Sequence, residues 1–517
     1  MANTHGGGAL IVGVDDHSAL LGTELDPEWL RGRLYEKLQR RLTVEVQPVT
    51  VRGTRLLVIT APEAVEPIRW KDKVFWRVSD KCVEIDSSTW HDRRHHRLQV
   101  DWSAQLSTLT AAEVRAGAIE VARDFLRESG DSSAQDLADA PTPDLLRRLN
   151  AVDGDGKLTN AAALLFVGRP EPCLDYMRRE VAGGDSQARV HRPDRSLIEQ
   201  LQEVFTTARA HNPVRHIGDG LAVGQVRQIP ERALREAIVN GVAHREWHLA
   251  APTVIEHIGG LLRVTSPGGF VSGITAQNII NHPSTSRNTR LTELLAVVKV
   301  AEREGIGVDR MYGDMLRLGH PAPAIVEVGG PQVVTSLIAN DIDDSWIAWL
   351  DQLDDPMAKN DLRILMSLKL VVEQGWVDEE RLAPFLQLPV AEAQDVVNML
   401  AGLTIKGTGA FTDVQGVPAG TSLVKALSPE ARATLQKLDS RHHRHRRWPT
   451  REKIALSYAR ARGRISTTEL GELVGASATN LGGVLNGLEE QGILRPSRTQ
   501  RRGAGFHYVY VPEAQQS

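Results

Sequence analysis

Three polar residues recur at intervals of four in one short stretch of the sequence. Residues 233–252 are ALREAIVNGVAHREWHLAAP, which places Glu236, Asn240 and His244 four positions apart. In an α-helix such positions differ by about 40° and share a face. That face offers a carboxylate to orient water, an amide oxygen to a metal ion and an imidazole to a phosphate. The same spacing also occurs on ordinary solvated helices, so it needs companion features before it indicates a site.

Two glycine-containing stretches supply those companions. SPGGF, residues 266–270, places Gly268 and Gly269 directly after a predicted strand, where a backbone can approach a ligand too closely for any Cβ. GIGVDRM places Gly305 and Gly307 before a predicted helix, where unpaired N–H groups and the helix dipole favour phosphate. Each glycine pair alone is also compatible with a turn or a helix cap. The order of the three stretches is more specific than any one of them.

Together, the three stretches resemble the GHKL ATPase fold of DNA gyrase, MutL and histidine kinases, in the divergent "RecG-like C-terminal" form of bacterial ATP-binding regulators. ALREAIVNGVAHRE resembles its N-box, and SPGGF and GIGVDRM resemble its two glycine boxes. The resemblance implies ATP and Mg²⁺ as cofactors, with Asn240 binding the metal and Glu236 polarising water where hydrolysis occurs. It also implies nucleotide contacts from His244, Ser266, Gly268, Gly269, Gly305 and Gly307, and from Arg287 and Asn288 in a lid at residues 281–288.

The sequence departs from the GHKL pattern at one position. GHKL enzymes place an adenine-reading aspartate just before the first glycines, and the nearby residue here is Ser266. A serine can accept a hydrogen bond from the adenine amino group but carries no charge, so a lower affinity is expected. We therefore expect nucleotide binding, and at most a weak GHKL-type ATPase activity.

A second glycine-rich stretch, GDGKLTNAAALLFVGRP at residues 154–170, superficially resembles a phosphate loop. A P-loop requires a glycine five positions before the Gly156-Lys157 pair, and position 151 is alanine. The stretch is better explained as a turn that leads into a core element, capped by Thr159 or Asn160. With no other P-loop match, a P-loop helicase is not predicted.

Length and composition predict a multidomain cytosolic protein. A chain of 517 residues, with 41% apolar and 24% charged residues, is expected to form about three or four globular domains. Cys82 and Cys173 are too few and too far apart for a disulfide framework, which fits a reducing cytoplasm. The sequence shows neither a signal peptide nor a membrane span, so no membrane partner is expected. The net charge of −4 excludes a uniformly basic surface but not local basic patches.

The first ninety residues alternate apolar runs and turns. ALIVGV, VEVQPVTV, RLLVITAP and VFWRVSD predict strands, and PEWLRGRLYEKLQRRL, residues 27–42, predicts a helix. MANTHGGGALIVGVDD and FWRVSDKCVEID resemble the Schlafen/AlbA-type domain found upstream of the same ATPase module. Members of that family begin earlier, with an acidic segment, and only Asp15 and Asp16 resemble part of a metal-binding carboxylate cluster. A strand-end turn explains both aspartates better than a nuclease site.

The carboxy-terminal part changes to short helices. Residues 357–404 and 451–512 each fit helix, turn, helix and hairpin, which predicts two winged-helix-like modules joined by the basic stretch RHHRHRRW at 441–448. In the second module, residues 477–492 predict a recognition helix and RPSRTQRRGAG a basic wing. A winged helix can also mediate protein contacts, and a basic hairpin can simply be solvated. The candidate nucleic-acid contacts are Ser477, Thr479, Asn480, Arg495, Arg498, Arg501 and Arg502.

These observations predict an α+β multidomain protein with an AlbA-type α/β unit, a GHKL-like α/β sandwich and C-terminal winged-helix modules. The expected function is that of a cytoplasmic, homo-oligomeric regulator in which ATP tunes binding to double-stranded DNA. A nucleotide-free DNA-bound scaffold and a Schlafen-type nuclease are the alternatives. The expected domains are 1–90 (AlbA-type), 91–225 (helical connector and middle segment), 226–340 (GHKL-like), 341–435 (winged-helix-like) and 436–517 (basic linker and winged helix).

Overall fold

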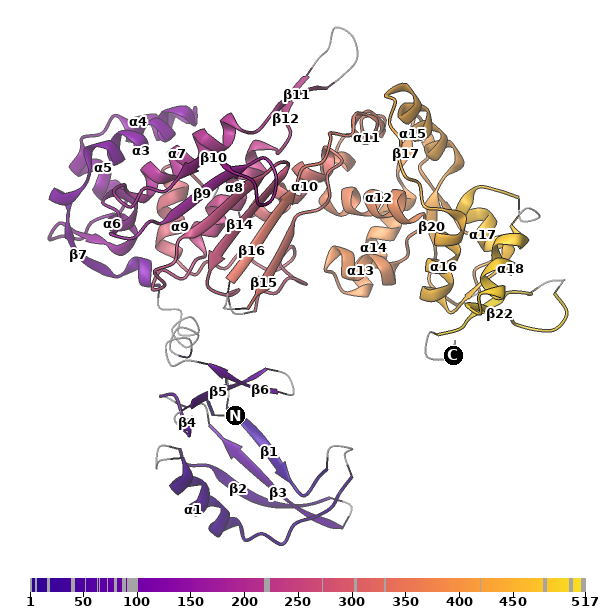
Figure 1. Ribbon diagram of the computed structural model, residues 1–517, viewed down its shortest axis with the longest axis horizontal. Coiled ribbons are helices and arrows are strands. Elements are labelled where there is room, and N and C mark those ends of the chain that lie inside the picture. Colours follow the sequence, from indigo (N-terminus) through magenta and orange to yellow (C-terminus); the bar gives the residue numbers. More distant parts are fainter. Residues whose placement is uncertain are drawn as a thin grey trace. The chain divides into compact units, whose positions relative to one another are not determined.

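The chain forms two compact units, Met1–Asp101 and Trp102–Ser517, shown in Figure 1. No helix in the described part of the chain is long and apolar enough to cross a membrane. The computed structural model describes residues 2–4, 7–15, 19–38, 42–51, 53–62, 64, 66–71, 73–78, 81–85, 90, 101–217, 224–271, 273–301, 305–329, 332–418, 420–477, 481–501 and 505–512.

The first unit combines two small antiparallel sheets with one helix. Its elements are β1 (Gly8–Val12), α1 (Pro27–Lys37), β2 (Glu45–Val51), β3 (Thr54–Ala61), β4 (Arg69–Trp70), β5 (Lys73–Val78) and β6 (Lys81–Ile85). The sheets have the strand orders β1-β3-β2 and β4-β5-β6. The sequence predicts α1 through residue 42, but the helix ends at Lys37, because Leu42 is buried in the core at the approach to β2.

Asn3 ties the amino terminus of the first unit to its second sheet. Its Nδ2 donates hydrogen bonds to the carbonyls of Ile68 (2.8 Å) and Phe75 (3.1 Å), and its Oδ1 accepts one from Ile68 N at 2.8 Å. The carbonyl of Asn3 accepts a hydrogen bond from the indole of Trp90, which is fully buried. The asparagine of the Ala-Asn-Thr motif is therefore a structural residue in this domain.

A six-stranded mixed sheet organises the second unit. Its strands are β9 (Leu174–Arg179), β10 (Ser186–Val190), β13 (Thr253–Ile258), β14 (Leu261–Pro267), β15 (Ala324–Val328) and β16 (Gln332–Ile338). The order is β10-β9-β13-β14-β16-β15, and β9 and β13 are parallel while the other neighbours are antiparallel. The sheet therefore includes two strands from the segment 91–225, which the sequence analysis assigns to a connector.

The β13–β14 hairpin turns at two consecutive glycines, Gly259 and Gly260. Gly259 has φ +54° and Gly260 does not have a positive φ, so only the first glycine meets the backbone requirement of a type I′ turn. A Cβ on Gly260 would lie 2.3 Å from the carbonyl oxygen of Ala339, so the second glycine is needed for close backbone approach.

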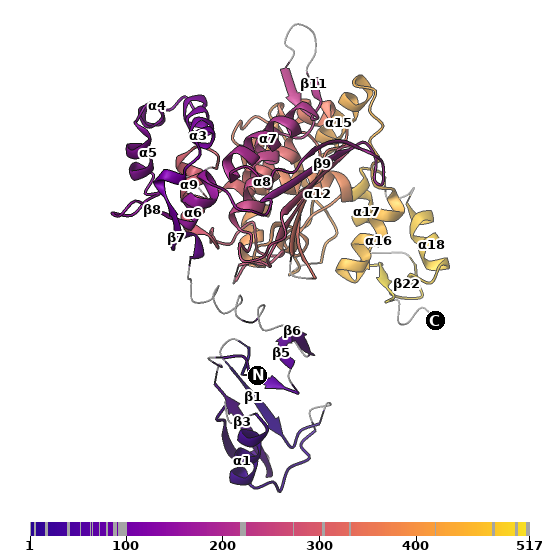
Figure 2. The same cartoon turned by 60° about the vertical axis from the view of Figure 1, so that its left-hand side comes forward.

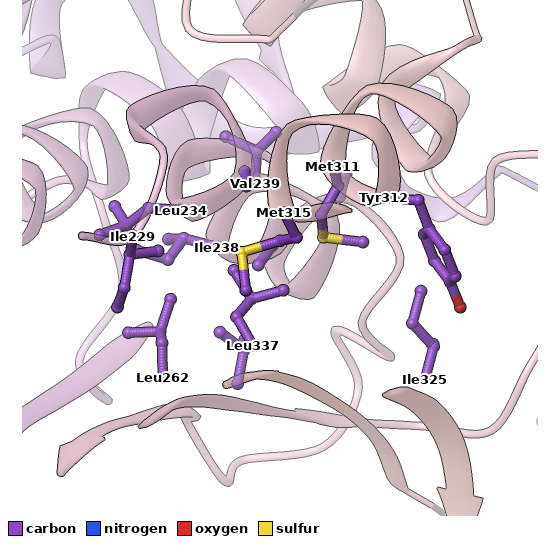
Figure 3. Close-up of a cluster of buried hydrophobic side chains, with 14 of the residues drawn as sticks. Ile229, Leu234, Ile238, Val239, Leu262, Met311, Tyr312, Met315, Ile325 and Leu337 are labelled. Atoms are coloured by element: carbon purple, nitrogen blue, oxygen red, sulfur yellow. The ribbon is translucent and has the colours of Figure 1, made fainter. Parts of the chain in front are cut away.

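Three helices cover one face of the sheet: α7 (Leu197–Ala210), α8 (Glu231–Ala243) and α10 (Gly307–Arg317). Residues of β9, β13 and β14 alternate between buried and half-buried, as expected when only one face is covered. Figure 3 shows Ile238 of α8 and Met315 of α10 meeting above Leu337 of β16. This packing fixes the position of α8 against α10.

Helices and a small two-stranded sheet, β7-β8, flank this core. They are η1 (Trp102–Ala104), β7 (Leu106–Thr110), η2 (Ala111–Glu113), α3 (Ala116–Glu128), α4 (Ser132–Ala138), α5 (Thr142–Arg148), β8 (Lys157–Thr159), α6 (Asn160–Phe166) and α9 (Thr289–Val297). Thr159 caps α6 by accepting a hydrogen bond from Ala162 N at 3.2 Å. The residues of α6 after Asn160 are buried, so the stretch 154–170 is a turn into a core helix, as predicted.

A two-stranded ribbon projects from the second unit. It consists of β11 (Val214–Ile217) and β12 (Gly224–Arg227), which pair antiparallel with each other. Both views show the ribbon extending away from the sheet and its covering helices (Figures 1 and 2).

The carboxy-terminal part contains two modules of similar element order. The first comprises α11 (Asp344–Leu350), η3 (Ala358–Asn360), α12 (Leu362–Gln374), α13 (Glu379–Leu386), α14 (Val390–Ala401), β17 (Thr404–Ile405), β18 (Thr408–Gly409), β19 (Phe411–Asp413), β20 (Lys425–Leu427) and α15 (Pro429–Arg441). The second comprises α16 (Arg451–Arg462), β21 (Arg464–Ile465), α17 (Thr467–Val474), α18 (Gly482–Glu490), β22 (Leu494–Pro496) and β23 (Tyr508–Tyr510). The last three strands form a sheet of order β21-β23-β22.

The basic stretch between these modules is docked on acidic residues. Arg446 contacts Asp343 at 3.0 Å and Asp439 at 3.0 Å, and all three side chains are largely buried. Arg444 Nε also lies 3.1 Å from Asp343. Two of the arginines in this stretch therefore hold the module junction together.

Candidate functional site

The helix α8 presents the polar stripe expected from its sequence. Ala233, Ala237 and Ile238 are buried against the sheet, while Glu236 and Asn240 are half-buried on the side that faces a cavity. The helix ends at Ala243, and the C-cap residue His244 also lines the cavity. The three residues therefore face one cavity, as their spacing predicts.

The cavity has a volume of about 310 Å³ and lies between α8, the end of β14, the start of α10 and the chain between β14 and α9. This volume is at the lower end of the range of small-molecule sites. Most of its wall is apolar, with a limited number of polar groups. The lining includes Glu236, Asn240, His244, Ser266, Gly269, Gly305, Gly307, Asp309 and Thr335.

Glu236 and Asn240 act as a pair at the start of α10. Asn240 Nδ2 donates a hydrogen bond to Glu236 Oε1 at 3.0 Å. Burial raises the pKa of Glu236, while the hydrogen bond from Asn240 and the charge of Arg310 oppose that shift. A Cβ on Gly307 would lie 1.7 Å from Glu236 Oε1, so the carboxylate occupies the space that a side chain would need. Gly307 is thus required by the close approach of Glu236.

Asn240 keeps its amide oxygen available on the cavity side. Its nitrogen is committed to Glu236, and no described residue donates a hydrogen bond to Oδ1. An amide oxygen next to a carboxylate is a donor set that suits Mg²⁺, which prefers hard oxygen ligands and retains several waters. The residues present therefore fit the metal that the resemblance implies.

The surroundings of His244 favour its neutral imidazole. Burial and, to a lesser extent, the nearby charge of Arg287 together lower the pKa of His244 to about 4. A neutral imidazole can donate one hydrogen bond and accept another. His244 is therefore suited to contact a ligand or its bound water, without contributing positive charge to the cavity.

The start of α10 supplies backbone N–H groups that have no partner among the described residues. The first intrahelical bond runs from Arg310 N to the carbonyl of Ile306 at 3.0 Å, which leaves the N–H groups of Gly307, Val308 and Asp309 outside the helical ladder. These three residues line the cavity. Gly305, just before them, has φ +67° and lies against Ser284. This is the geometry in which helix N-termini bind phosphate.

Ser266 and Thr335 place two hydroxyl groups on the sheet side of the cavity. Ser266 Oγ donates to the carbonyl of Gly241 at 2.8 Å, so it faces a ligand as an acceptor only. Thr335 lies on β16 opposite Val264 of β14. The sequence analysis did not include Thr335, because only the pairing of β14 with β16 brings it to the cavity.

Asp309 is a second cavity residue that the sequence analysis did not include. It lies in the first turn of α10, and burial raises the pKa of its carboxyl. Its position within the GIGVDRM stretch was a usable signal, because a first-turn residue lies close to the N–H groups at the start of a phosphate-binding helix. With Glu236 it makes this end of the cavity rich in carboxyl groups, which favours a ligand that arrives with a metal ion.

Arg287 and Asn288 hold the cavity walls and do not line the cavity. Arg287 donates to the carbonyl of Gly269 at 2.6 Å and contacts Glu246 at 3.3 Å. Gly268, with φ +102°, has no room for a Cβ because Arg287 Nη1 would lie 2.3 Å from it. Asn288 Nδ2 donates to the carbonyls of Ala243 (2.8 Å) and Arg245 (2.9 Å). Both side chains thus stabilise the glycine turn and the end of α8.

The candidate nucleic-acid contacts in the last module have different environments. Arg495 is exposed on β22, and Arg498 and Ser477 are exposed as well. Arg501 makes a bidentate contact with Glu489 of α18 at 2.7 and 2.8 Å, so its charge is partly neutralised. Thr479, Asn480 and Arg502 lie outside the described residues.

Comparisons with known proteins confirm the two resemblances on which the sequence analysis relied. Residues 1–86 match the family described as "Schlafen, AlbA_2", and residues 254–335 match the family described as "Putative ATP-dependent DNA helicase recG C-terminal". The chain thus combines a Schlafen/AlbA-type region with an ATPase-like domain of the RecG C-terminal type. The second match begins after α8, so the assignment of Glu236, Asn240 and His244 rests on the geometry described above.

One solved structure resembles almost the whole chain. The crystal structure of the DIP2311 protein from Corynebacterium diphtheriae is 27% identical, covers 99% of this chain and 88% of that chain, and superimposes with a TM-score of 0.67. A comparison with curated proteins gave no match.

Proposed function

We propose that this protein is an ATP-binding, DNA-binding regulator, in which occupancy of the α8–α10 cavity tunes DNA binding or the oligomeric state. In this proposal the second unit contains a GHKL-like sandwich followed by two winged-helix modules. The observation that carries the proposal is that one cavity is lined both by the Glu236–Asn240 pair and by the N-terminus of α10. Carboxylate, amide oxygen and free N–H groups together suit a metal-bound polyphosphate.

In this proposal different residues bind the phosphates and the base of the nucleotide. Asn240 Oδ1 would bind Mg²⁺. The ion would neutralise part of the phosphate charge, and so it would reduce the repulsion between the phosphates and the carboxyl groups of Glu236 and Asp309. The N–H groups at the start of α10 would bind phosphate oxygens, and Ser266 and Thr335 would meet the base as neutral hydrogen-bonding groups. Glu236 would orient a water molecule if hydrolysis occurs.

Substitution of Asn240 with alanine tests nucleotide binding. We expect the variant to bind Mg-ATP at least about tenfold more weakly than the wild type, because it loses both the metal ligand and the donor that orients Glu236. Isothermal titration calorimetry measures the change. Asn398→Ala is the matched control, since the side chain of Asn398 is exposed on α14 and, among the described residues, hydrogen bonds only to Gln394 of the same helix. If the wild type gives no binding heat, the nucleotide-free scaffold becomes the better account.

DNA binding in this proposal uses the last module and the AlbA-type unit. Arg495 extends from β22 with no described partner, so it can contact phosphate without losing an existing ion pair. In the first unit, α1 exposes Trp29, Arg33 and Lys37 at intervals of four, which places an aromatic ring and two cations along one side of a helix. Both surfaces have the chemistry expected for a phosphate backbone.

The two wing arginines provide a matched test of DNA contact. We expect Arg495→Ala to weaken binding to duplex DNA and to reduce the slope of log K against log salt by about one. Arg501→Ala should have a smaller effect, because the Arg501 guanidinium is held by Glu489. Fluorescence anisotropy at several salt concentrations measures both. Equal salt slopes for the wild type and Arg495→Ala would exclude this wing residue from the contact.

The nuclease alternative receives no support from the aspartate that the structure describes. Asp15 Oδ1 accepts a hydrogen bond from Ala19 N at 2.7 Å, which makes it part of a turn after β1. Asp16 lies outside the described residues. Incubation of labelled RNA and DNA with Mn²⁺ tests the alternative directly, and intact substrate is the expected result.

A further inference from the structure

The cavity wall is hydrogen bonded to the first carboxy-terminal module. Gln387, the C-cap residue of α13, accepts a hydrogen bond from Ile280 N at 2.9 Å and donates one to the carbonyl of Ala276 at 2.9 Å. Asn281 Nδ2 donates to the carbonyls of Leu386 (2.7 Å) and Gln387 (3.0 Å). Four hydrogen bonds therefore join residues 276–281 to the end of α13, more than 100 positions away in sequence.

Ile280 connects the cavity to this contact within a single residue. It lines the cavity, and its own N–H group donates to the side chain of Gln387. Ile279 lines the cavity beside it, and both isoleucines pack against the main hydrophobic core. A ligand that displaces these residues must change the hydrogen bonds to α13 or move α13 with them.

The backbone at Gln387 supports a role for its side chain. Gln387 has φ +57° and ψ +33°, a left-handed conformation in which glycine is the usual helix-ending residue. A glutamine there is strained by its Cβ, and such strain persists where the surrounding structure uses the residue. At Gln387 two hydrogen bonds offset the strain, because the side-chain oxygen accepts one and the side-chain nitrogen donates the other.

The other end of the cavity contacts the same module. α10, whose first turn lines the cavity, packs against α12, and Lys369 of α12 donates to the carbonyl of Gly319 just after α10 at 2.8 Å. α12 in turn packs against α13 and α14. Both sides of the cavity are thus attached to one three-helix group.

The helix that follows the Gln387 turn is poorly suited to contact DNA. α14 exposes Glu392 and Asp395, two carboxylates that a phosphate backbone would repel. The module's position in the chain, between the cavity and the last module, is also what a connecting element requires.

We propose that the first carboxy-terminal module is a relay that senses occupancy of the cavity through the hydrogen bonds of Gln387 to residues 276–280. The inference rests on the proposed nucleotide binding and adds its route of transmission. A ligand that orders the wall around Ile280 stabilises the end of α13 and the start of α14. In a protein that lacks the Gln387 side chain, the cavity binds the same ligand while the module does not respond.

Hydrogen exchange followed by mass spectrometry tests the relay on the full chain. Amide exchange of residues 379–401 is measured with and without saturating Mg-ATP, and calorimetry on the same samples reports binding. The key variant is Gln387→Gly, because glycine adopts a positive φ without strain and should leave α13 folded while removing both side-chain hydrogen bonds. Gln394→Ala is the matched control, since the side chain of this α14 glutamine hydrogen bonds, within the described part of the chain, only to Asn398 of its own helix.

We expect Mg-ATP to slow exchange of residues 379–401 at least threefold in the wild type and in Gln394→Ala, but not in Gln387→Gly, with binding heat retained in all three. Binding heat without slower exchange in the wild type overturns the relay and leaves the proposed nucleotide site intact. Slower exchange in Gln387→Gly equal to the wild type also overturns it. Absence of binding heat in the wild type overturns the nucleotide site, and with it the relay.

Discussion

Replacement of Gly307 with alanine is expected to disable the cavity and to destabilise the second unit by about 1–3 kcal/mol, the usual cost of overpacking a buried site. The added methyl group would lie 1.7 Å from Glu236 Oε1 and 2.2 Å from Glu236 Cδ, so the carboxylate must move. It is half-buried and held by the hydrogen bond from Asn240, which limits the positions open to it. We expect Mg-ATP affinity to fall at least about tenfold, measured by calorimetry.

A double-mutant cycle separates this steric effect from a general effect of alanine on α10. Glu236→Ala removes the atoms that the new methyl group would meet, so the combined variant should be more stable than the sum of the single changes predicts, by about 1 kcal/mol or more. Gly313→Ala is the control within the same helix, because a Cβ there would meet only Arg317 Nη2 at 3.9 Å. Additive effects of Glu236→Ala and Gly307→Ala would show that the carboxylate does not fill the space beside Gly307.

Local sequence patterns predicted the parts of the site that are contiguous in the chain. The spacing of Glu236, Asn240 and His244 placed them on one side of α8 because helix geometry alone determines that relation. The glycines at 305 and 307 predicted the start of a helix, and α10 begins at Gly307. These features depend on residues close in sequence, where periodicity and glycine conformation carry the information.

The parts that escaped prediction depend on pairing between distant segments. β9 and β10 join the central sheet because β9 pairs in parallel with β13, some eighty residues later, and no local pattern specifies such a partner. Thr335 reaches the cavity only through the register of β16 on β14. The contacts of Gln387 with residues 276–281 are likewise invisible to periodicity, because they join a loop to a helix cap. Tertiary contacts, not propensity, complete the site.

Arg245 illustrates how such long-range contacts position α8. Its side chain is fully buried and donates to the carbonyls of Leu249 (2.8 Å), Ala251 (2.6 Å) and Cys173 (3.3 Å). The guanidinium lies 4.2 Å from the ring centre of Trp247, and burial lowers the pKa of Arg245 to about 10. The side chain therefore ties the end of α8 to the approach to β13 and to the approach to β9.

We expect Arg245→Met to lower the free energy of unfolding of the second unit by about 3–5 kcal/mol. Methionine removes the charge along with its donors, so the loss comes mainly from the two short hydrogen bonds to the carbonyls of Leu249 and Ala251, since a hydrogen bond to a charged group contributes about 1.5–3 kcal/mol. Urea titration followed by circular dichroism measures the change. Arg235→Met is the matched control, because Arg235 is exposed on α8 and should change stability by less than about 0.5 kcal/mol. Asn288 donates a hydrogen bond to the backbone carbonyl of Arg245, so a shift of the chain at Arg245 should also weaken Mg-ATP binding. Normal affinity in a destabilised variant would show that the cavity does not depend on the Arg245 side chain.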